Sequence, residues 1–279
     1  MLTALRRSST CLIVTLACAN AYAQRPGAKP GPVAKQSPVF GFERSAPGPY
    51  GIEEIRADWP GYGGSGDFGR GTIVQDGPSQ GKALRVAYPK DAVGPKTGGM
   101  QFVVPLPPAD EYWLTYHVKF EEGFDFRKGG KLPGLTSGGS KFTGGRGATS
   151  GDGWSARYMW KDGGKLQVYL YHTDMKGEYG DGIYVPDARF TPGRWHELTQ
   201  HIKLNNGDAT DGVLEVWFDG RPALQRTDIR YRLGGRGPID SFYFSTFHGG
   251  NSADWAPQND SFARFDDFSL ERTRPAFVK

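Results

Sequence analysis

Cysteine is almost absent from this chain of 279 residues, which contains only Cys11 and Cys18. Both lie within residues 1–23, where two arginines precede an apolar stretch and Ala21-Tyr22-Ala23 forms a small-x-small cleavage site. These features predict a secretory signal peptide that is removed before Gln24. The mature chain would then have neither a disulfide nor a thiol nucleophile, so its fold must depend on a hydrophobic core alone.

Long apolar runs are also lacking. The apolar part of the leader is shorter than the about 20 residues that span a bilayer, and no later run comes close, so we expect no membrane anchor. The leader therefore predicts a secreted or periplasmic protein. An alternative is a lipoprotein acylated on Cys18, which Thr15 disfavours because such signals prefer an aliphatic residue at that position.

Residues 24–37 are rich in Pro, Gly and Lys and have no hydrophobic periodicity, which predicts a disordered linker. Residues 38–279 are enough for one domain. Without the leader, basic and acidic residues are almost balanced, so the net charge does not indicate a nucleic-acid partner. We expect the domain to be a monomer without a cofactor.

Helical spacing of apolar residues is not evident after residue 38. Short runs with strand-like composition alternate instead with Gly, Pro and Asp turns, and aromatic residues are frequent. So many strands at this spacing predict an all-β fold, a jelly-roll sandwich of two antiparallel sheets. The runs expected to be strands are 39–43, 83–88, 100–104, 112–120, 154–160, 165–171, 195–204, 213–218, 242–247 and 262–270.

Two of these runs predict a hairpin with a defined register. Apolar and polar residues alternate in 154–160 and again in 165–171. A three-residue loop, 162–164, with a glycine in the left-handed region would pair Trp160 with Leu166. A shift by one residue would set apolar against polar side chains along the whole ladder, so the pattern selects this register.

The predicted register places Arg157 opposite Tyr169 and Ser155 opposite Tyr171, on a polar and aromatic face that also carries Gln167. A cation, a hydroxyl group and two phenols on one face would be unusual for a plain solvent-exposed surface. An exposed sheet face with ordinary cross-strand pairs is the alternative, because Tyr and Arg are common there.

Several segments resemble one known family and together span most of residues 38–279. They are 123–134 (GFDFRKGGKLPG), 153–160 (GWSARYMW), 168–171 (VYLY), 195–196 (WH), 214–220 (LEVWFDG) and 244–250 (FSTFHGG), followed by Trp255 and 265–268. These segments are similar to the alginate lyases of polysaccharide lyase family 14 and to their glucuronan-cleaving relatives.

The resemblance implies a β-jelly roll with a substrate cleft over one sheet, and cleavage of an acidic polysaccharide by β-elimination. The family's functional residues are a lysine in the KLPG segment, a Ser-x-Arg pair and a Tyr-x-Tyr pair. By motif match these are Lys131, Ser155 and Arg157, and Tyr169 and Tyr171. Apart from Lys131, these are the residues that the hairpin register brings together.

The chemistry of elimination explains these residue types. The proton on carbon 5 of a uronate becomes acidic enough only when the adjacent carboxylate is neutralised, and Lys131 and Arg157 are suited to hold that carboxylate. A phenol titrates near 10, so Tyr171 can be a base only if nearby cations favour its phenolate. Our hypothesis is that Tyr171 is the acid and base, Lys131 the neutraliser, Arg157 and Ser155 substrate binders, and Tyr169 a support or alternative base.

Two further residues are candidates for substrate binding. Gln167 shares the predicted face, and His117 precedes Lys131 on a strand, in a family whose glucuronan-cleaving members use a histidine. A structural histidine is an equal alternative for His117. His248 stands where the family usually has an aromatic residue, and we expect it only to occupy the end of a strand.

No metal is expected at the site. The pair His196 and His201 lacks the spacing of a zinc motif and would point to opposite faces of a strand. A structural calcium held by Asp266 and Asp267, with Glu43, is a less favoured alternative.

Three functional classes follow. The first is a polyuronate lyase, with mannuronate-rich alginate ahead of glucuronan. The second is a glycoside hydrolase using the carboxylates of Asp174, Glu178 and Asp181. The third is a non-catalytic carbohydrate-binding module, which needs aromatic residues but no general base. The combination of Lys131 and Arg157 with two tyrosines favours the lyase.

Overall fold

The structure is a computed structural model that describes residues 39–63, 69–78 and 80–278. The expected signal peptide, 1–23, and the expected linker, 24–37, lie outside the described residues. Within the described part, no helix is both long and apolar enough to cross a membrane.

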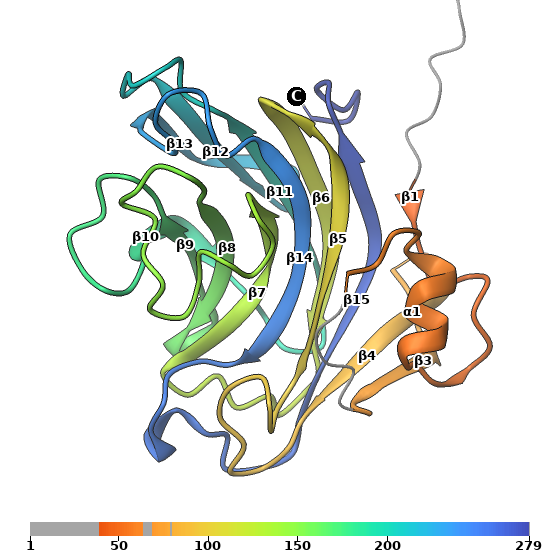
Figure 1. Ribbon diagram of the computed structural model, residues 1–279. Helices are drawn as coiled ribbons and strands as arrows, with labels where there is room; N and C mark the ends of the chain where they lie inside the picture. Colours follow the sequence, from red (N-terminus) through yellow and green to blue (C-terminus); the bar gives the residue numbers. More distant parts are fainter. Residues whose placement is uncertain (1–38, 64–68, 79, 279) are drawn as a thin grey trace, which may run out of the picture. The chain divides into compact units, whose positions relative to one another are not determined.

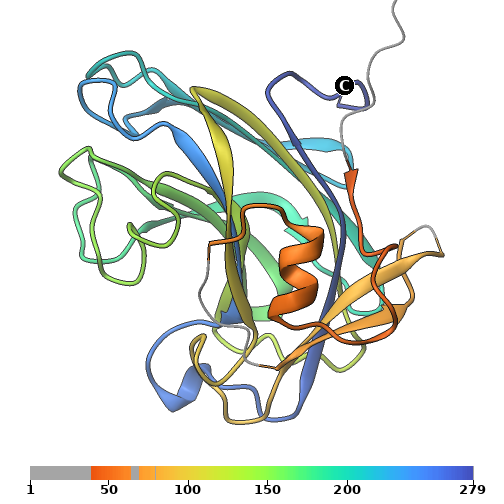
Figure 2. The same ribbon diagram turned by 45° about the vertical axis from the view of Figure 1, so that its right-hand side comes forward.

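The fold consists of two antiparallel sheets (Figures 1 and 2). One sheet has six strands in the order β10-β9-β8-β7-β14-β5, and the other has nine, with β13-β12-β11-β6-β15-β4-β3-β2 as its main path and β1 beside β15. The strands of the first sheet are β5 (Met100–Ala109), β7 (Gly129–Thr136), β8 (Ser155–Lys161), β9 (Lys165–Tyr171), β10 (Asp181–Arg189) and β14 (Ile239–His248). Those of the second are β1 (Val39–Phe40), β2 (Gly48–Pro49), β3 (Gly71–Gln75), β4 (Lys82–Tyr88), β6 (Glu111–Phe120), β11 (Trp195–Lys203), β12 (Gly212–Phe218), β13 (Arg221–Ile229) and β15 (Ser261–Glu271). The predicted jelly-roll sandwich is confirmed.

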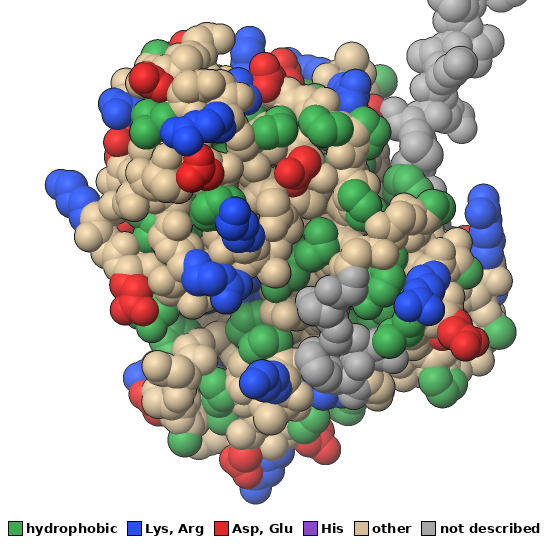
Figure 3. Space-filling model, in the orientation of Figure 1, with side chains coloured by type: hydrophobic (Ala, Val, Ile, Leu, Met, Phe, Trp, Pro, Cys, Tyr) green, Lys and Arg blue, Asp and Glu red, His purple; other side chains and the backbone are tan. Residues whose placement is uncertain are grey.

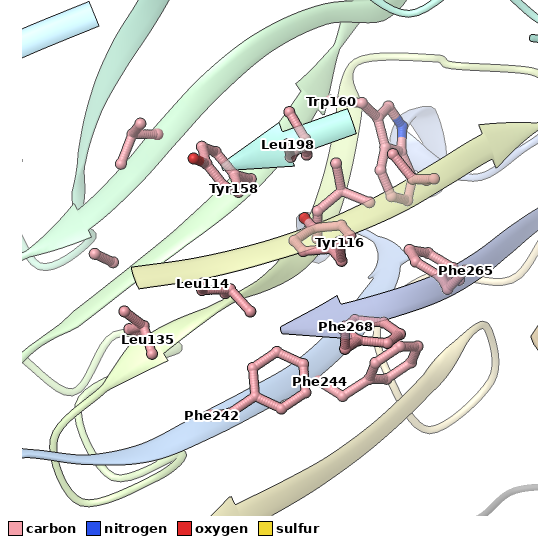
Figure 4. Packing of buried hydrophobic residues seen from close by; sticks show 14 of the residues in the cluster. Leu114, Tyr116, Leu135, Tyr158, Trp160, Leu198, Phe242, Phe244, Phe265 and Phe268 are labelled. Carbon is pink, nitrogen blue, oxygen red and sulfur yellow. The ribbon is translucent and has the colours of Figure 1, made fainter. Parts of the chain in front are cut away.

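The main core lies between the two sheets and is rich in aromatic rings (Figure 4). Tyr116 on β6 stacks on Phe268 of β15, while Phe244 on β14 packs edge-on against Phe265. Trp160 on β8 is fully buried as well. Each buried large apolar side chain contributes about 1.5–3 kcal/mol. Burial of this kind stabilises the sandwich in place of disulfides.

The hairpin of β8 and β9 has the predicted register. Its three-residue loop, Asp162–Gly164, has Gly163 at φ 61° and Gly164 at φ 78°, in the left-handed region. Trp160 pairs with Leu166, and the polar pairs follow at the predicted positions. The alternation of side chains therefore predicted the register correctly.

Strand β7 was not predicted, because its sequence GGKLPGLT is rich in residues that disfavour strands. The structure explains the glycines by close packing. A Cβ atom at Gly130 would lie 2.0 Å from the ring of Trp160, and one at Gly134 would lie 2.2 Å from the carbonyl oxygen of Ala156. The lack of side chains is what allows this strand to fit between its neighbours.

The helix α1 (Ile52–Asp58), beside β3 and β4 in Figure 1, was not predicted either. Its seven residues are too few for a visible helical period. Glu54 accepts a hydrogen bond from the Gly51 N–H at its start, and Ile55 is fully buried.

Asp266 on β15 is a buried carboxyl group in the nine-stranded sheet. It is 2% exposed, and its Oδ1 has no hydrogen-bond partner among the described residues. Burial raises its pKa to about 7, and the negative charges of Asp267 and Glu43 add to the shift. The described residues contain no group of three or more His, Cys, Asp or Glu side chains placed to hold a metal. The calcium alternative at these three carboxylates therefore gains no support.

We predict that Asp266 makes stability depend on pH. Its native pKa lies above the value of about 3.9 expected in the unfolded chain, so the native state holds a proton that the unfolded state releases. This contribution is complete below about pH 4 and is lost as pH rises through about 7. We compare the free energy of unfolding of Asp266→Asn with that of wild type by urea unfolding at about pH 5 and at about pH 8. The difference should shift in favour of the variant by about 2 kcal/mol from the lower to the higher pH. An equal difference in free energy of unfolding between variant and wild type at both pH values would contradict this. The control is Asp91→Asn, which changes an exposed carboxylate.

Candidate active site

The outer face of the six-stranded sheet carries a row of side chains that crosses five strands. Pairing between neighbouring strands aligns Phe247 on β14 with Lys131 on β7, Lys131 with Met159 on β8, Met159 with Gln167 on β9, and Gln167 with Tyr184 on β10. Side chains at directly paired positions lie on the same face. Lys131 and Gln167, which are distant in sequence, therefore belong to one surface.

A second row lies next to the first. It runs from Tyr243 on β14 through Gly134 on β7 and Arg157 on β8 to Tyr169 on β9 and Gly182 on β10. The two rows bring a lysine, an arginine and a tyrosine together. On the side of the molecule seen in Figure 3, Lys and Arg side chains form patches around the area where Figure 1 draws β7 and β8.

Lys131 is held in an apolar and aromatic environment. Its Nζ lies 3.2 Å from Sδ of Met159 and 4.0 Å from the ring centre of Tyr169. The side chain is nearly buried, and none of the described carboxylates forms an ion pair with it. Burial lowers the pKa of Lys131 well below its ordinary value, and the positive charges of Arg157 and Lys161 lower it further. The amine can therefore lose its proton far more easily than a surface lysine.

Arg157 is a buried cation beside Lys131. It is 2% exposed, donates a hydrogen bond of 3.1 Å from Nη1 to Oγ of Ser245, and lies 5.3 Å from the ring centre of Tyr243. Its Nε has no partner among the described groups. Burial lowers the pKa of Arg157, but a guanidinium remains protonated in proteins. Arg157 is thus a permanent positive charge with a free donor.

Ser245 and Tyr243 were missed at first, although a signal for them exists. In β14, Phe242 and Phe244 belong to the core, so the alternation places Tyr243, Ser245 and Phe247 on the outer face. The segment FSTFHGG was noted only as a family motif. The predicted strand 242–247 contains both residues, and the period of two applied to that strand places Tyr243 and Ser245 on one face.

Tyr169 and Tyr171 form a pair of phenols whose oxygens lie 3.4 Å apart. Tyr169 is half-buried, and burial, followed by its contact with Tyr171, raises its pKa, against which the charge of Arg157 acts only in part. Tyr171 is fully buried, in a small cluster with Phe142, Ala148 and Met175. Tyr169 is therefore the member of the pair that remains accessible.

Tyr171 is covered by the loop 137–154, which connects β7 to β8. The hydroxyl oxygen of Tyr171 accepts a hydrogen bond of 3.1 Å from the Gly145 N–H. Ser155 is also fully buried and donates its hydroxyl hydrogen to the carbonyl oxygen of Phe142 at 2.8 Å. The structure thus brings Ser155 to the site, but its hydroxyl fixes the loop instead of facing open space.

His117 is the one candidate that the structure does not bring to this group. It lies on β6 in the nine-stranded sheet, where its side chain is 3.8 Å from Glu197 and 3.5 Å from Asp267. His117 and Lys131 lie on strands of different sheets, which favours the structural alternative for His117 over substrate binding. His248 ends β14, as expected, and its Nε2 donates to the Asp125 carbonyl oxygen at 2.7 Å.

The carboxylates considered for hydrolysis have other contacts. Asp174 lies 3.5 Å from Arg230, and Asp181 lies 2.8 Å from His172. Both are thus engaged with basic side chains instead of forming an acid and base pair with each other. The hydrolase alternative gains no support from this geometry.

Comparison with known proteins agrees with the fold. The sequence profile of polysaccharide lyase 14 matches residues 76–268. The structure of the alginate lyase Aly36B has 30% sequence identity and a TM-score of 0.75, covering 85% of this chain and 97% of Aly36B. Variants of Aly36B have been solved with alginate trisaccharide and tetrasaccharide. No curated protein sequence shows a significant match.

More distant structures share the fold alone. The alginate lyase of Aplysia kurodai has 24% identity and a TM-score of 0.68, covering 80% of this chain and 94% of its own. The endo-β-1,4-glucuronan lyase of the fungus Trichoderma reesei has 14% identity and a TM-score of 0.51, covering 82% and 95%.

The jelly-roll sandwich, with a lysine, an arginine and two tyrosines on one sheet face, defines an enzyme of the polysaccharide lyase class. The chain belongs to polysaccharide lyase family 14.

We predict that Gly180 is needed to position Tyr171. A Cβ atom at Gly180 would lie 2.6 Å from Cδ2 of the Tyr171 ring, so Gly180→Ala must displace that ring. Displacing a group of the site by about 1 Å can cost on the order of a hundredfold in rate. We expect kcat/KM to fall by about ten- to a hundredfold, measured by the release of unsaturated, ultraviolet-absorbing ends. The control is Gly177→Ala in the same loop, where the nearest atom would be 3.6 Å away. Equal activity of both variants would show that Tyr171 tolerates the displacement.

Proposed function

We propose that this enzyme cleaves a polyuronate by β-elimination, with mannuronate-rich alginate as its preferred substrate. The observation that carries the proposal is a pair of buried basic residues, Lys131 and Arg157, beside two phenols on one sheet face. Arg157 stays charged although it is buried and has no carboxylate partner among the described residues, which is costly, and an acidic substrate would supply the missing negative charge. Alginate is favoured over glucuronan because Aly36B is an alginate lyase at 30% identity, whereas the glucuronan lyase shares only the fold.

Arg157 is the residue best suited to neutralise the uronate carboxylate. Its charge does not depend on pH, and none of the described carboxylates neutralises it. A guanidinium aimed at a carboxylate stabilises the extra negative charge that develops when the proton on carbon 5 is removed. The sequence-based hypothesis assigned neutralisation of the carboxylate to Lys131, with Arg157 helping to hold it.

Lys131 is better suited to be the base than to be a fixed positive charge. Its lowered pKa allows a neutral amine, which can accept the proton from carbon 5. Tyr171, the base in our initial hypothesis, lies beneath the loop 137–154, and its hydroxyl already accepts a hydrogen bond from Gly145. The contacts therefore favour Lys131 for proton removal.

The phenol pair can supply the proton for the leaving oxygen. The raised pKa of Tyr169 keeps this phenol protonated, and the side chain remains partly accessible. Tyr171 then positions Tyr169 through their contact of 3.4 Å. In this scheme Lys131 gains the carbon 5 proton, the bond between carbon 4 and its oxygen breaks, and Tyr169 protonates that oxygen.

The features of residues 1–23 also support the proposal that the mature enzyme starts at Gln24 and acts outside the cytoplasm, and we propose that it is a monomer. The substrates in question are large polymers, which an exported enzyme meets directly.

The substrate class is tested by incubating the enzyme with polymannuronate, polyguluronate, mixed alginate and glucuronan. We expect unsaturated ends to form fastest on polymannuronate, because the proposed site holds a uronate and Aly36B, at 30% identity, is an alginate lyase. Ultraviolet absorbance reports elimination, and a reducing-end assay reports total cleavage. Reducing ends without the absorbance would indicate hydrolysis, and faster cleavage of glucuronan would replace alginate as the substrate.

The role of Lys131 is tested by Lys131→Arg and Lys131→Ala. Arginine keeps the positive charge but cannot act as a base near neutral pH, so both variants should lose about 10²- to 10⁴-fold in kcat. In the wild type, kcat/KM should fall as pH falls through the lowered pKa of Lys131, because the amine becomes protonated. Melting temperatures check that the variants are folded. If Lys131→Arg retained a tenth or more of the activity, Lys131 would be a neutraliser and Tyr171 would again be the candidate base.

A further inference from the structure

Tyr184 on β10 is an exposed aromatic residue at the end of the row that contains Lys131. It is 51% exposed, and its directly paired residue on β9 is Gln167. Ile183 and Val185, its neighbours in sequence, pack against or within the main core, so Tyr184 must point to the outer face. The accessible ring thus lies on the same face as the catalytic group.

On the outer face of the edge strand β10, the positions next to Tyr184 have no side chains. Gly180 and Gly182 occupy the two preceding positions on the same side, and neither has a side chain that could form a rim. A Cβ atom at Gly182 would lie 2.6 Å from Nε2 of Gln167, so the amide of Gln167 occupies that space. No side chain from Gly180 or Gly182 therefore projects between Tyr169 and Tyr184, and the ring of Tyr184 borders this flat surface.

Basic side chains lie one step further along the same two strands. Lys165 is two residues before Gln167 and shares its face, and it pairs with Arg189 on β10. Lys165 lies 3.2 Å from Asp162 in the hairpin loop, and Arg189 donates to the carbonyl oxygen of Gly163. A polymer with many carboxylates that reached Tyr184 would meet Arg189 and the ion pair of Lys165 with Asp162 beside an aromatic ring.

Isolated exposed aromatic residues are common and usually have no function. Tyr184 differs because strand pairing places it in register with Lys131. Neighbouring strands are about 4.8 Å apart, so Tyr184 lies roughly 14 Å from Lys131 across the sheet. At that distance, Tyr184 is too far from Lys131 to contact the two sugar units that flank the cleaved bond. It can contact a more distant unit of a long chain.

We propose that Tyr184 forms a distal sugar-binding subsite, in which its ring stacks against a pyranose ring of the polyuronate. The C–H face of a pyranose is apolar and fits the face of an aromatic ring, while the carboxylates at its edge turn toward Lys165 and Arg189. This inference rests on the proposed function and adds the position of a remote binding site. The subsite makes the enzyme prefer long chains, because only long chains reach from Lys131 to Tyr184.

The test compares Tyr184→Ala and Tyr184→Phe on the best polymer and on the shortest oligomer that the wild type cleaves. For Tyr184→Ala we expect KM for the polymer to rise about three- to tenfold, the size typical of one aromatic stacking contact, with kcat unchanged. The oligomer should be cleaved as by wild type. Tyr184→Phe keeps the ring and should behave as wild type on both. The control, Phe277→Ala, removes a ring with the same exposure of 51% from the C-terminal segment.

Two results would overturn the subsite: an unchanged KM of Tyr184→Ala on the polymer, or an equal loss on polymer and oligomer, which would indicate a displaced catalytic group. If the wild type produced no unsaturated ends from any polymer, the proposed function would fail, and the subsite would be tested by electrophoresis in gels containing each polymer. Weaker retardation of Tyr184→Ala than of Phe277→Ala would then support the subsite, and equal retardation would exclude it.

Discussion

The pairing of β7, β8 and β9 is the constraint on which the site depends. Because side chains alternate between the two faces, the inward packing of Tyr158 and Trp160 fixes which residues of β8 point outward. Strand pairing then places Arg157 beside Tyr169 and Met159 beside Lys131. The geometry of the candidate site is thus a consequence of core packing on the opposite side of the same strands.

The burial of two basic residues on one face has an energetic cost that the fold itself does not offset with carboxylates. Lys131 has the sulfur of Met159 and the ring of Tyr169 as neighbours, and Arg157 has Ser245 and Tyr243. Such contacts stabilise a cation less than an ion pair does. Stability and binding are therefore opposed here, since the buried charge of Arg157, which costs stability in the free enzyme, favours the arrival of an anionic ligand.

Much of the fold was predictable from sequence where the period of two is clear. The hairpin of β8 and β9 was predicted to the residue, since its apolar positions permit a single register. Strand β7 was not, because glycine and proline hide a strand whose existence depends on the shapes of Trp160 and Ala156. The same limit applies to the site. Register predicted the Arg157 and Tyr169 pair, whereas the place of Lys131 came from family resemblance, and the covering of Tyr171 by the loop 137–154 followed from neither.

Strand β10 has a consequence beyond the binding of sugars. An edge strand presents unpaired backbone groups to which another sheet can add, which is a common start of aggregation. In β10 the regular pairing with β9 stops after Tyr184, Pro186 supplies no N–H donor, and Asp187 adopts a positive φ of 56°. These features shorten the run of unpaired backbone groups on β10 that another strand could pair with, next to the exposed ring of Tyr184. The exposed ring of Tyr184 is thus combined with an edge that offers a second protein chain few backbone groups for pairing.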